Sequence, residues 1–387
     1  MPKNSARPGH VRSLALILFA CCALWPSAAE AASGFDWIDH NTNLTIYADI
    51  RLRYELDWDS HTPGGVSRDD RNRGRIRARL GFDYRLSDAW STGVRVRTGD
   101  SRSQQSPHLT FASDDGVRDD LGFVLDRYFV QYKEGPFSGW AGRNTFPFWQ
   151  QNELFWDDDV TPTGLAGSYG TPLGKGDLTA TLGAFYLPDG GYALNGQLLG
   201  SQVKYGIPLK PSTLTAAAGI YHMNGETGAE NLRNRNGERD YTIFQGSFQW
   251  SVPINRRPLV LGADFLKNLQ HYSAADVAPL SAINVDQTFG YVLSAQWGQL
   301  KQKHDWIIGY FYAHIETLAV NASYAQDDWF RFGNGVQTDS SDFQGHEVRL
   351  GYALSKNLNI LARLYSVEAI TSRQDGNRFR FDLNWKF

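Results

Sequence analysis

Residues 377–387, NRFRFDLNWKF, form the last stretch of the 387-residue sequence and decide its fold class. From Arg378 onward, every odd position is apolar and every even position is polar or charged. Successive side chains of a strand point to opposite faces, so this stretch is a strand with one apolar and one charged face. The last strand of an outer-membrane barrel has this pattern because it pairs with the first strand and faces lipid. The stretch predicts an all-β, antiparallel transmembrane β-barrel. Its final residue, Phe387, resembles the aromatic signal that the barrel-assembly machinery of Gram-negative bacteria recognises.

The beginning of the sequence predicts export from the cytoplasm. A positively charged start, with Lys3, Arg7 and Arg12, precedes the apolar run 14–25, which is too short to span a bilayer. Small residues at 29 and 31 then occupy the −3 and −1 positions of a cleavage site. Residues 1–31 are therefore expected to be a secretory signal peptide, followed by a barrel domain over residues 32–387.

Both cysteines, Cys21 and Cys22, lie within this predicted signal. A lipoprotein anchor is the alternative, but Phe19 fits the required motif poorly. The mature chain is then expected to lack disulfides, thiol nucleophiles and Cys-ligated metals.

Composition separates a β-barrel from a helical membrane protein. The mean hydropathy is −0.41, aromatic residues make up 13% of the chain and the net charge is −3. No stretch after the predicted signal has 18 consecutive apolar residues, so no transmembrane helix is expected. This profile is typical of a chain in which only alternate residues face lipid.

Alternation of apolar and polar residues predicts about sixteen strands, an even number as in bacterial barrels. The predicted strands are residues 44–56, 73–86, 90–98, 123–133, 138–144, 164–170, 178–187, 197–207, 213–222, 241–251, 259–267, 288–298, 305–316, 343–354, 358–368 and 378–387. Short turns and long polar connections alternate between them, which predicts periplasmic turns, extracellular loops and periplasmic termini. Six tryptophans at the short-turn ends predict an interfacial aromatic girdle; they are Trp90, Trp140, Trp250, Trp297, Trp306 and Trp385.

Ten arginines share the parity that is expected to face the lumen. They are Arg51, Arg53, Arg73, Arg75, Arg77, Arg79, Arg95, Arg97, Arg127 and Arg143. Because the first strands are neighbours, these arginines are expected to form a basic wall, which needs water or carboxylates beside it. In the alternative interpretation, the arginines are solvated or paired with Asp49, Glu55 and Asp83.

The connection over residues 145–163 carries both acids and aromatic residues. Its acids are Glu153, Asp157, Asp158 and Asp159, and its aromatic residues are Phe146, Phe148, Trp149, Phe155 and Trp156. So many aromatic residues are unusual in a solvated loop. We therefore expect this connection to fold into the lumen and narrow the pore opposite the arginines, creating a transverse field.

Two segments resemble a known family. Residues 125–133, LDRYFVQYK, and residues 142–165, which begin GRNTFPFW, are similar to the putative-porin family of Gram-negative outer membranes. The resemblance implies passive diffusion of small hydrophilic solutes across the outer membrane, here with an anionic preference from the arginines. Contact with lipid and lipopolysaccharide is expected, and a homotrimer is one expected assembly. The basic lumen is also similar to that of alginate-export barrels, so export of an acidic polysaccharide is an alternative.

A barrel hydrolase is the alternative from another class. Only His314 and Glu316 share a strand face, and a lumen hydrogen bond explains that pair better than catalysis. The sequence has no Gly-rich phosphate loop, zinc spacing or calcium loop, so neither a cofactor nor a metal is predicted. The run 157–159 could bind a cation, but pairing with arginine is the preferred interpretation. The signal peptide and charge argue against nucleic-acid binding.

Overall fold

The computed structural model describes residues 43–100, 105–188, 194–225, 239–273, 284–329 and 340–387. The predicted signal peptide, residues 1–31, lies outside these residues. Among the residues described, no helix has the length and apolarity that a membrane-crossing helix needs.

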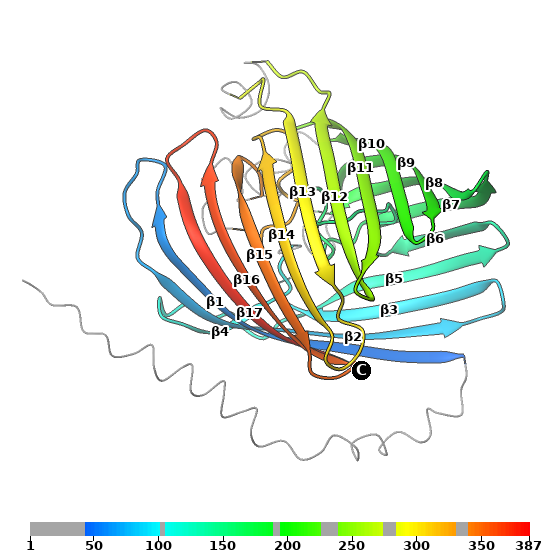
Figure 1. Ribbon diagram of the computed structural model, residues 1–387, viewed down its shortest axis with the longest axis horizontal. Coiled ribbons are helices and arrows are strands. Elements are labelled where there is room, and N and C mark those ends of the chain that lie inside the picture. Colours follow the sequence, from blue (N-terminus) through cyan, green and yellow to red (C-terminus); the bar gives the residue numbers. More distant parts are fainter. Residues whose placement is uncertain (1–42, 101–104, 189–193, 226–238, 274–283, 330–339) are drawn as a thin grey trace, which may run out of the picture. The chain divides into compact units, whose positions relative to one another are not determined.

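One antiparallel sheet closes on itself as a barrel (Figure 1). Its strands are β1 (Leu44–His61), β2 (Arg71–Arg85), β3 (Trp90–Thr98), β4 (Leu109–Ser113), β5 (Phe123–Glu134), β6 (Phe137–Arg143), β7 (Thr163–Leu173), β8 (Gly176–Pro188), β9 (Leu194–Leu209), β10 (Ser212–Asn224), β11 (Tyr241–Ile254), β12 (Arg257–Asn268), β13 (Phe289–Gly298), β14 (Trp306–Ile315), β15 (Phe343–Ala353), β16 (Leu358–Ala369) and β17 (Asp375–Lys386). All sixteen predicted strands are confirmed, most of them extended by a few residues.

β4 is the strand that sequence periodicity did not predict. It lies within the long connection between β3 and β5 and pairs with Arg73–Ile76, the part of β2 beyond its pairing with β3. β3 also pairs directly with β5, so β4 is an addition to the wall and not a seventeenth crossing. At five residues it is too short for alternation to distinguish it from a loop.

The barrel closes between its first and last strands, which run side by side in blue and red in Figure 1. The register sets Leu52 opposite Leu383 and Arg53 opposite Asp382. The main-chain groups of Phe387 exchange two hydrogen bonds with Ala48, at 2.9 and 3.0 Å. Matching parity on both strands therefore places the apolar face of the terminal stretch outside and its charges inside.

The outward face is apolar, as a lipid-facing surface requires. Leu182 on β8 is 66% exposed, whereas its neighbour Thr181 is buried. Trp90, on the same outward face, contacts the ring of Tyr132 with centroids 5.0 Å apart. The girdle prediction is wrong for Trp140, which packs against Phe185 of the interior cluster with centroids 5.6 Å apart.

Candidate functional site

The connection between β6 and β7 crosses the barrel interior. The backbone N–H of Trp149 donates to Gln202 on β9 at 2.8 Å, and Gln151 Nε2 donates to Asp264 on β12 at 3.0 Å. At its other end, Asp159 accepts from Arg79 on β2 at 3.0 Å. Because these strands are far apart around the barrel, the segment must extend from one wall to the other.

Aromatic side chains of this segment form an apolar core inside the barrel. Trp156 is fully buried and stacks on Phe146, with centroids 4.4 Å apart, and on Tyr324, with centroids 5.1 Å apart. Phe155 packs against Tyr221 of β10. Burial of such large rings fixes the segment firmly, since each contributes on the order of 2–3 kcal/mol of transfer free energy.

Tyr324 belongs to a second inserted segment, the connection between β14 and β15, which the sequence did not indicate. The two segments bind each other through main-chain and side-chain groups. The backbone N–H of Asp157 donates to the Tyr324 carbonyl at 2.8 Å. Gln326 Nε2 donates to Glu153 Oε2 at 2.7 Å. At least two interlocked connections therefore fill the interior, where the sequence predicted one.

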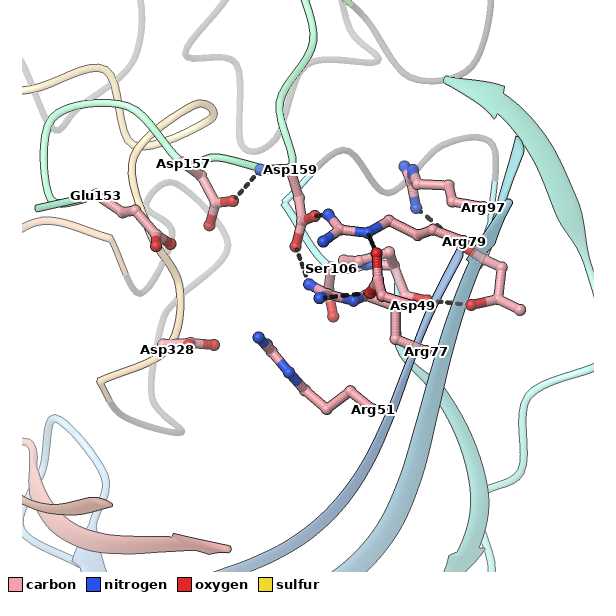
Figure 2. Close-up of polar contacts among 12 residues, drawn as sticks. Asp49, Arg51, Arg77, Arg79, Arg97, Ser106, Glu153, Asp157, Asp159 and Asp328 are labelled. Atoms are coloured by element: carbon pink, nitrogen blue, oxygen red, sulfur yellow. Dashed lines mark hydrogen bonds and ion pairs between the residues drawn. The ribbon is translucent and has the colours of Figure 1, made fainter. Parts of the chain in front are cut away.

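Of the four predicted loop acids, Asp159 is the one that meets the predicted basic wall. It forms ion pairs with Arg77 at 3.4 Å and Arg79 at 3.0 Å, while Asp49 of β1 binds the same two guanidiniums at 3.0 and 2.7 Å (Figure 2). Burial alone would raise the pKa of Asp159, but Arg77 and Arg79 outweigh it and hold the pKa below its ordinary value.

Glu153, Asp157 and Asp158 line a small cavity together with Arg51 and Arg363. Within the described part of the chain, none of their carboxylates has an ion pair, and their oxygens lie within 4.8 Å of one another. Burial, followed by the charges of Asp158 and Asp328, raises the pKa of Glu153 to about 8. Burial and the nearby Glu153 likewise raise the pKa of Asp157 well above its ordinary range. This acidic group therefore carries less negative charge at neutral pH than its composition suggests.

The ten predicted arginines lie on the adjacent strands β1, β2, β3, β5 and β6. Strand carboxylates contact several of them. Glu55 is fully buried and accepts from Arg73 and from Arg380, the latter at 2.7 Å. Asp382 binds Arg53 at 2.7 Å. Pairing with Asp49 and Glu55, the alternative interpretation, is thus present for part of the wall.

The remaining predicted arginines contact neutral groups or carboxylates on neighbouring strands. Arg75 donates to Ser106 at 2.9 Å and lies 4.0 Å from Glu55. Arg143 donates to both oxygens of Thr161, at 3.0 and 3.1 Å. Arg97 lies 3.9 Å from Asp126.

Pairing with Asp83 is wrong, because Asp83 forms no ion pair within the described part of the chain and its Oδ1 is buried without a hydrogen-bond partner. The carboxylate that forms an ion pair with an arginine of β3 is Asp126, which lies 2.6 Å from Arg95. The pairing of β3 with β5 skips Asp126, leaving it in a bulge between Leu125 and Arg127. A bulge places two consecutive side chains on one face, so strict alternation could not identify Asp126 as an inward residue.

Three further arginines form ion pairs with carboxylates inside the barrel. They are Arg363 from β16 and both Arg378 and Arg380 from β17. The alternating charges of the terminal stretch already signalled the last two. Arg363 and Asp328, the loop acid that it contacts at 3.5 Å, had no comparable signal.

Comparison with known families agrees with this architecture. The sequence pattern of the family described as "Putative porin" matches residues 55–234 and 238–387, which is most of the chain. This chain belongs to the putative-porin family.

Solved outer-membrane structures share the porin fold at low sequence identity. The high-pH structure of Pseudomonas putida OprB has a TM-score of 0.56 and 13% identity, covering 89% of this chain and 94% of that one. The complex of Salmonella typhi OmpF with daunomycin has a TM-score of 0.54 and 12% identity, covering 89% and 98%. No curated protein sequence matches significantly. The protein is a porin-family barrel of the Gram-negative outer membrane.

The His314–Glu316 pair differs from its prediction. The two side chains are 4.0 Å apart, but His314 has the outward parity of β14 and stacks on Tyr291, with ring centroids 5.4 Å apart. It is therefore part of the outer aromatic surface and not a lumen hydrogen bond.

Proposed function

We propose that this porin is a passive diffusion channel for small hydrophilic solutes and that its inward arginines make it prefer anions. The supporting observation is that Arg51 and Arg127 have only neutral partners. Arg51 donates to Asn384 at 2.7 Å, and Arg127 donates to Asn144 at 2.9 Å and to Tyr47 at 3.3 Å. No carboxylate of the described residues forms an ion pair with either guanidinium, so both charges remain available to attract anions.

The protonation of Glu153 in the connection between β6 and β7 also favours a preference for anions. Arg51 extends from β1 toward Glu153 and Asp328 (Figure 2). Because the raised pKa keeps Glu153 mainly protonated at pH 7, the positive charge of the wall is only partly opposed there. The transverse field expected from the sequence is correspondingly weaker than four ionised acids would produce.

The test is the reversal potential of the refolded protein in a planar bilayer under a potassium chloride gradient. We expect chloride selectivity in the wild type and a reduced chloride preference in the Arg51→Gln/Arg127→Gln variant. Lys301→Gln is the matched control, because it removes an exposed cation in the turn between β13 and β14. Cation selectivity in the wild type, or an unchanged ratio in the double variant, would contradict the proposal.

Export of an acidic polysaccharide is a less suitable function for this interior. The buried rings of Trp156 and Tyr324 and the interlocked segments occupy the interior through which a polymer would have to pass. We also propose a non-enzymatic role, since the His314–Glu316 pair faces outward.

We further propose that lipid and lipopolysaccharide contact the apolar outer band, that the assembly machinery recognises Phe387, and that the barrel forms a homotrimer. Analytical ultracentrifugation in detergent would test the trimer. A single monomeric species would contradict it.

A further inference from the structure

A loop carboxylate occupies a group of arginines on the barrel wall. Asp328 lies 3.5 Å from Arg53 on β1, 3.5 Å from Arg363 on β16, and is also ion-paired with Arg380 on β17. The main-chain carbonyl of Asp328 accepts a hydrogen bond from Arg378 on β17 at 2.9 Å. We call Arg53, Arg363, Arg378 and Arg380 the arginine cage.

Asp328 differs from the other carboxylates that contact the cage. Glu55, Asp57, Asp382 and Glu347 project from strands, so the hydrogen-bonded sheet fixes their positions. Asp328 projects from the connection between β14 and β15. Its side chain is 17% exposed, compared with 0% for Asp382. Asp328 can therefore leave the cage without breaking any strand pairing.

Departure of Asp328 would leave an excess of buried positive charge. Arg53 and Arg363 would share Asp382, at 2.7 and 3.8 Å, Arg380 would keep Glu55 at 2.7 Å, and Arg378 would keep Asp57 at 2.6 Å. These strand carboxylates, and Glu347 beside Arg363, also pair with Arg71, Arg73 and Arg349, so arginines would outnumber carboxylates. Removing one carboxylate from a buried group of arginines is destabilising, so another anion is expected to replace it. Planar guanidinium groups match carboxylate oxygens in geometry, which favours an organic acid over a spherical ion.

We propose that the arginine cage binds a carboxylate group of a permeating solute, and that Asp328 is the internal carboxylate that this solute displaces. The inference rests on the proposed anion permeation and names its solute class, small organic acids. The adjoining cavity, lined in part by Arg51, Arg363 and Asp328, has a volume of about 30 Å³. It holds about one water molecule. A solute carboxylate therefore displaces Asp328 and does not bind beside it.

The test uses the full barrel in planar bilayers, with succinate as the probe and uncharged succinamide as its analogue. Transient interruptions of the chloride current measure succinate binding. We expect Asp328→Asn to bind succinate at least tenfold more tightly than the wild type, because the competing charge is removed. Adding Arg363→Gln to this variant should abolish the gain. Asp286→Asn is the control, since it neutralises an exposed loop carboxylate outside the cage.

The proposal would be overturned if the wild type and Asp328→Asn bound succinate with equal affinity. It would also be overturned if succinamide bound as tightly as succinate. If Asp328→Asn does not fold, Arg363→Gln alone provides the second test, and it should weaken succinate binding at least threefold. Loss of the proposed function is distinguishable, because it would appear as no chloride current in any variant. Calorimetric titration of the detergent-solubilised barrel with succinate would then still decide whether the cage binds carboxylates.

Discussion

The contact between the two inserted segments is expected to weaken at alkaline pH. Glu153 is one of the residues that link them: its side chain accepts from Gln326 Nε2 at 2.7 Å, and its main-chain carbonyl accepts from the Gln326 N–H at 3.0 Å. Burial and nearby carboxylates raise its pKa to about 8, from an ordinary value of 4.5. Protonated Glu153 is compatible with Asp158 and Asp328, whereas ionised Glu153 is repelled by both.

The direction and size of the effect follow from proton linkage. The packed segments hold the Glu153 proton up to about pH 8, whereas separated segments release it near pH 4.5. Raising the pH therefore favours separation, and the effect levels off above the packed-state pKa. Between pH 7 and 9 the packed state loses at most about 1.4 kcal/mol, which is about a tenfold change in the packed-to-separated ratio.

Single-channel conductance at pH 7 and pH 9 measures this change. We expect a larger open-channel conductance, or a larger open fraction, at pH 9 in the wild type. Glu153→Gln mimics the protonated side chain and should give nearly equal values at both pH values. Asp286→Asn, in an exposed loop, should behave as the wild type. An equally strong pH dependence in Glu153→Gln would refute the assignment of the transition to Glu153.

Three further outcomes are expected. Asp159→Asn should destabilise the barrel by about 3 kcal/mol in urea unfolding followed by tryptophan fluorescence, because it removes one carboxylate from the buried Arg77 and Arg79; a midpoint equal to that of the wild type would contradict this. Leu182→Arg, on the lipid-facing side of β8, should cost about 2–4 kcal/mol in the same assay in lipid, whereas Leu182→Ala should cost less. Phe387→Ser should lower the yield of folded barrel in cells but leave refolding in detergent intact, as judged by heat-modifiable gel mobility; an equal cellular yield would argue against recognition of the terminal aromatic residue.

Local chemistry was sufficient to predict the sheet. The alternation in strands such as β1 and β17 is a property of neighbouring residues, because a period of two places side chains on opposite faces whatever the partner strand is. The ten arginines were identified in the same way. The inward parity of Asp126 escaped this reasoning, since a bulge depends on how β3 and β5 pair. Trp140 was predicted to face outward but packs inside the barrel, because a tryptophan near a short turn can lie on either face of its strand.

The sequence by itself therefore determined the class of barrel, the strands that cross the membrane and the arginine-rich composition of its inner face. Only the tertiary structure decided which carboxylates neutralise those arginines. Asp159 reaches β2 from a connection 80 residues away, and Asp328 reaches β1 from one 275 residues away. The physical reason is that ion pairing depends on distances of a few ångströms between groups distant in sequence. No periodicity within a strand records which loop will fold across the lumen to meet it.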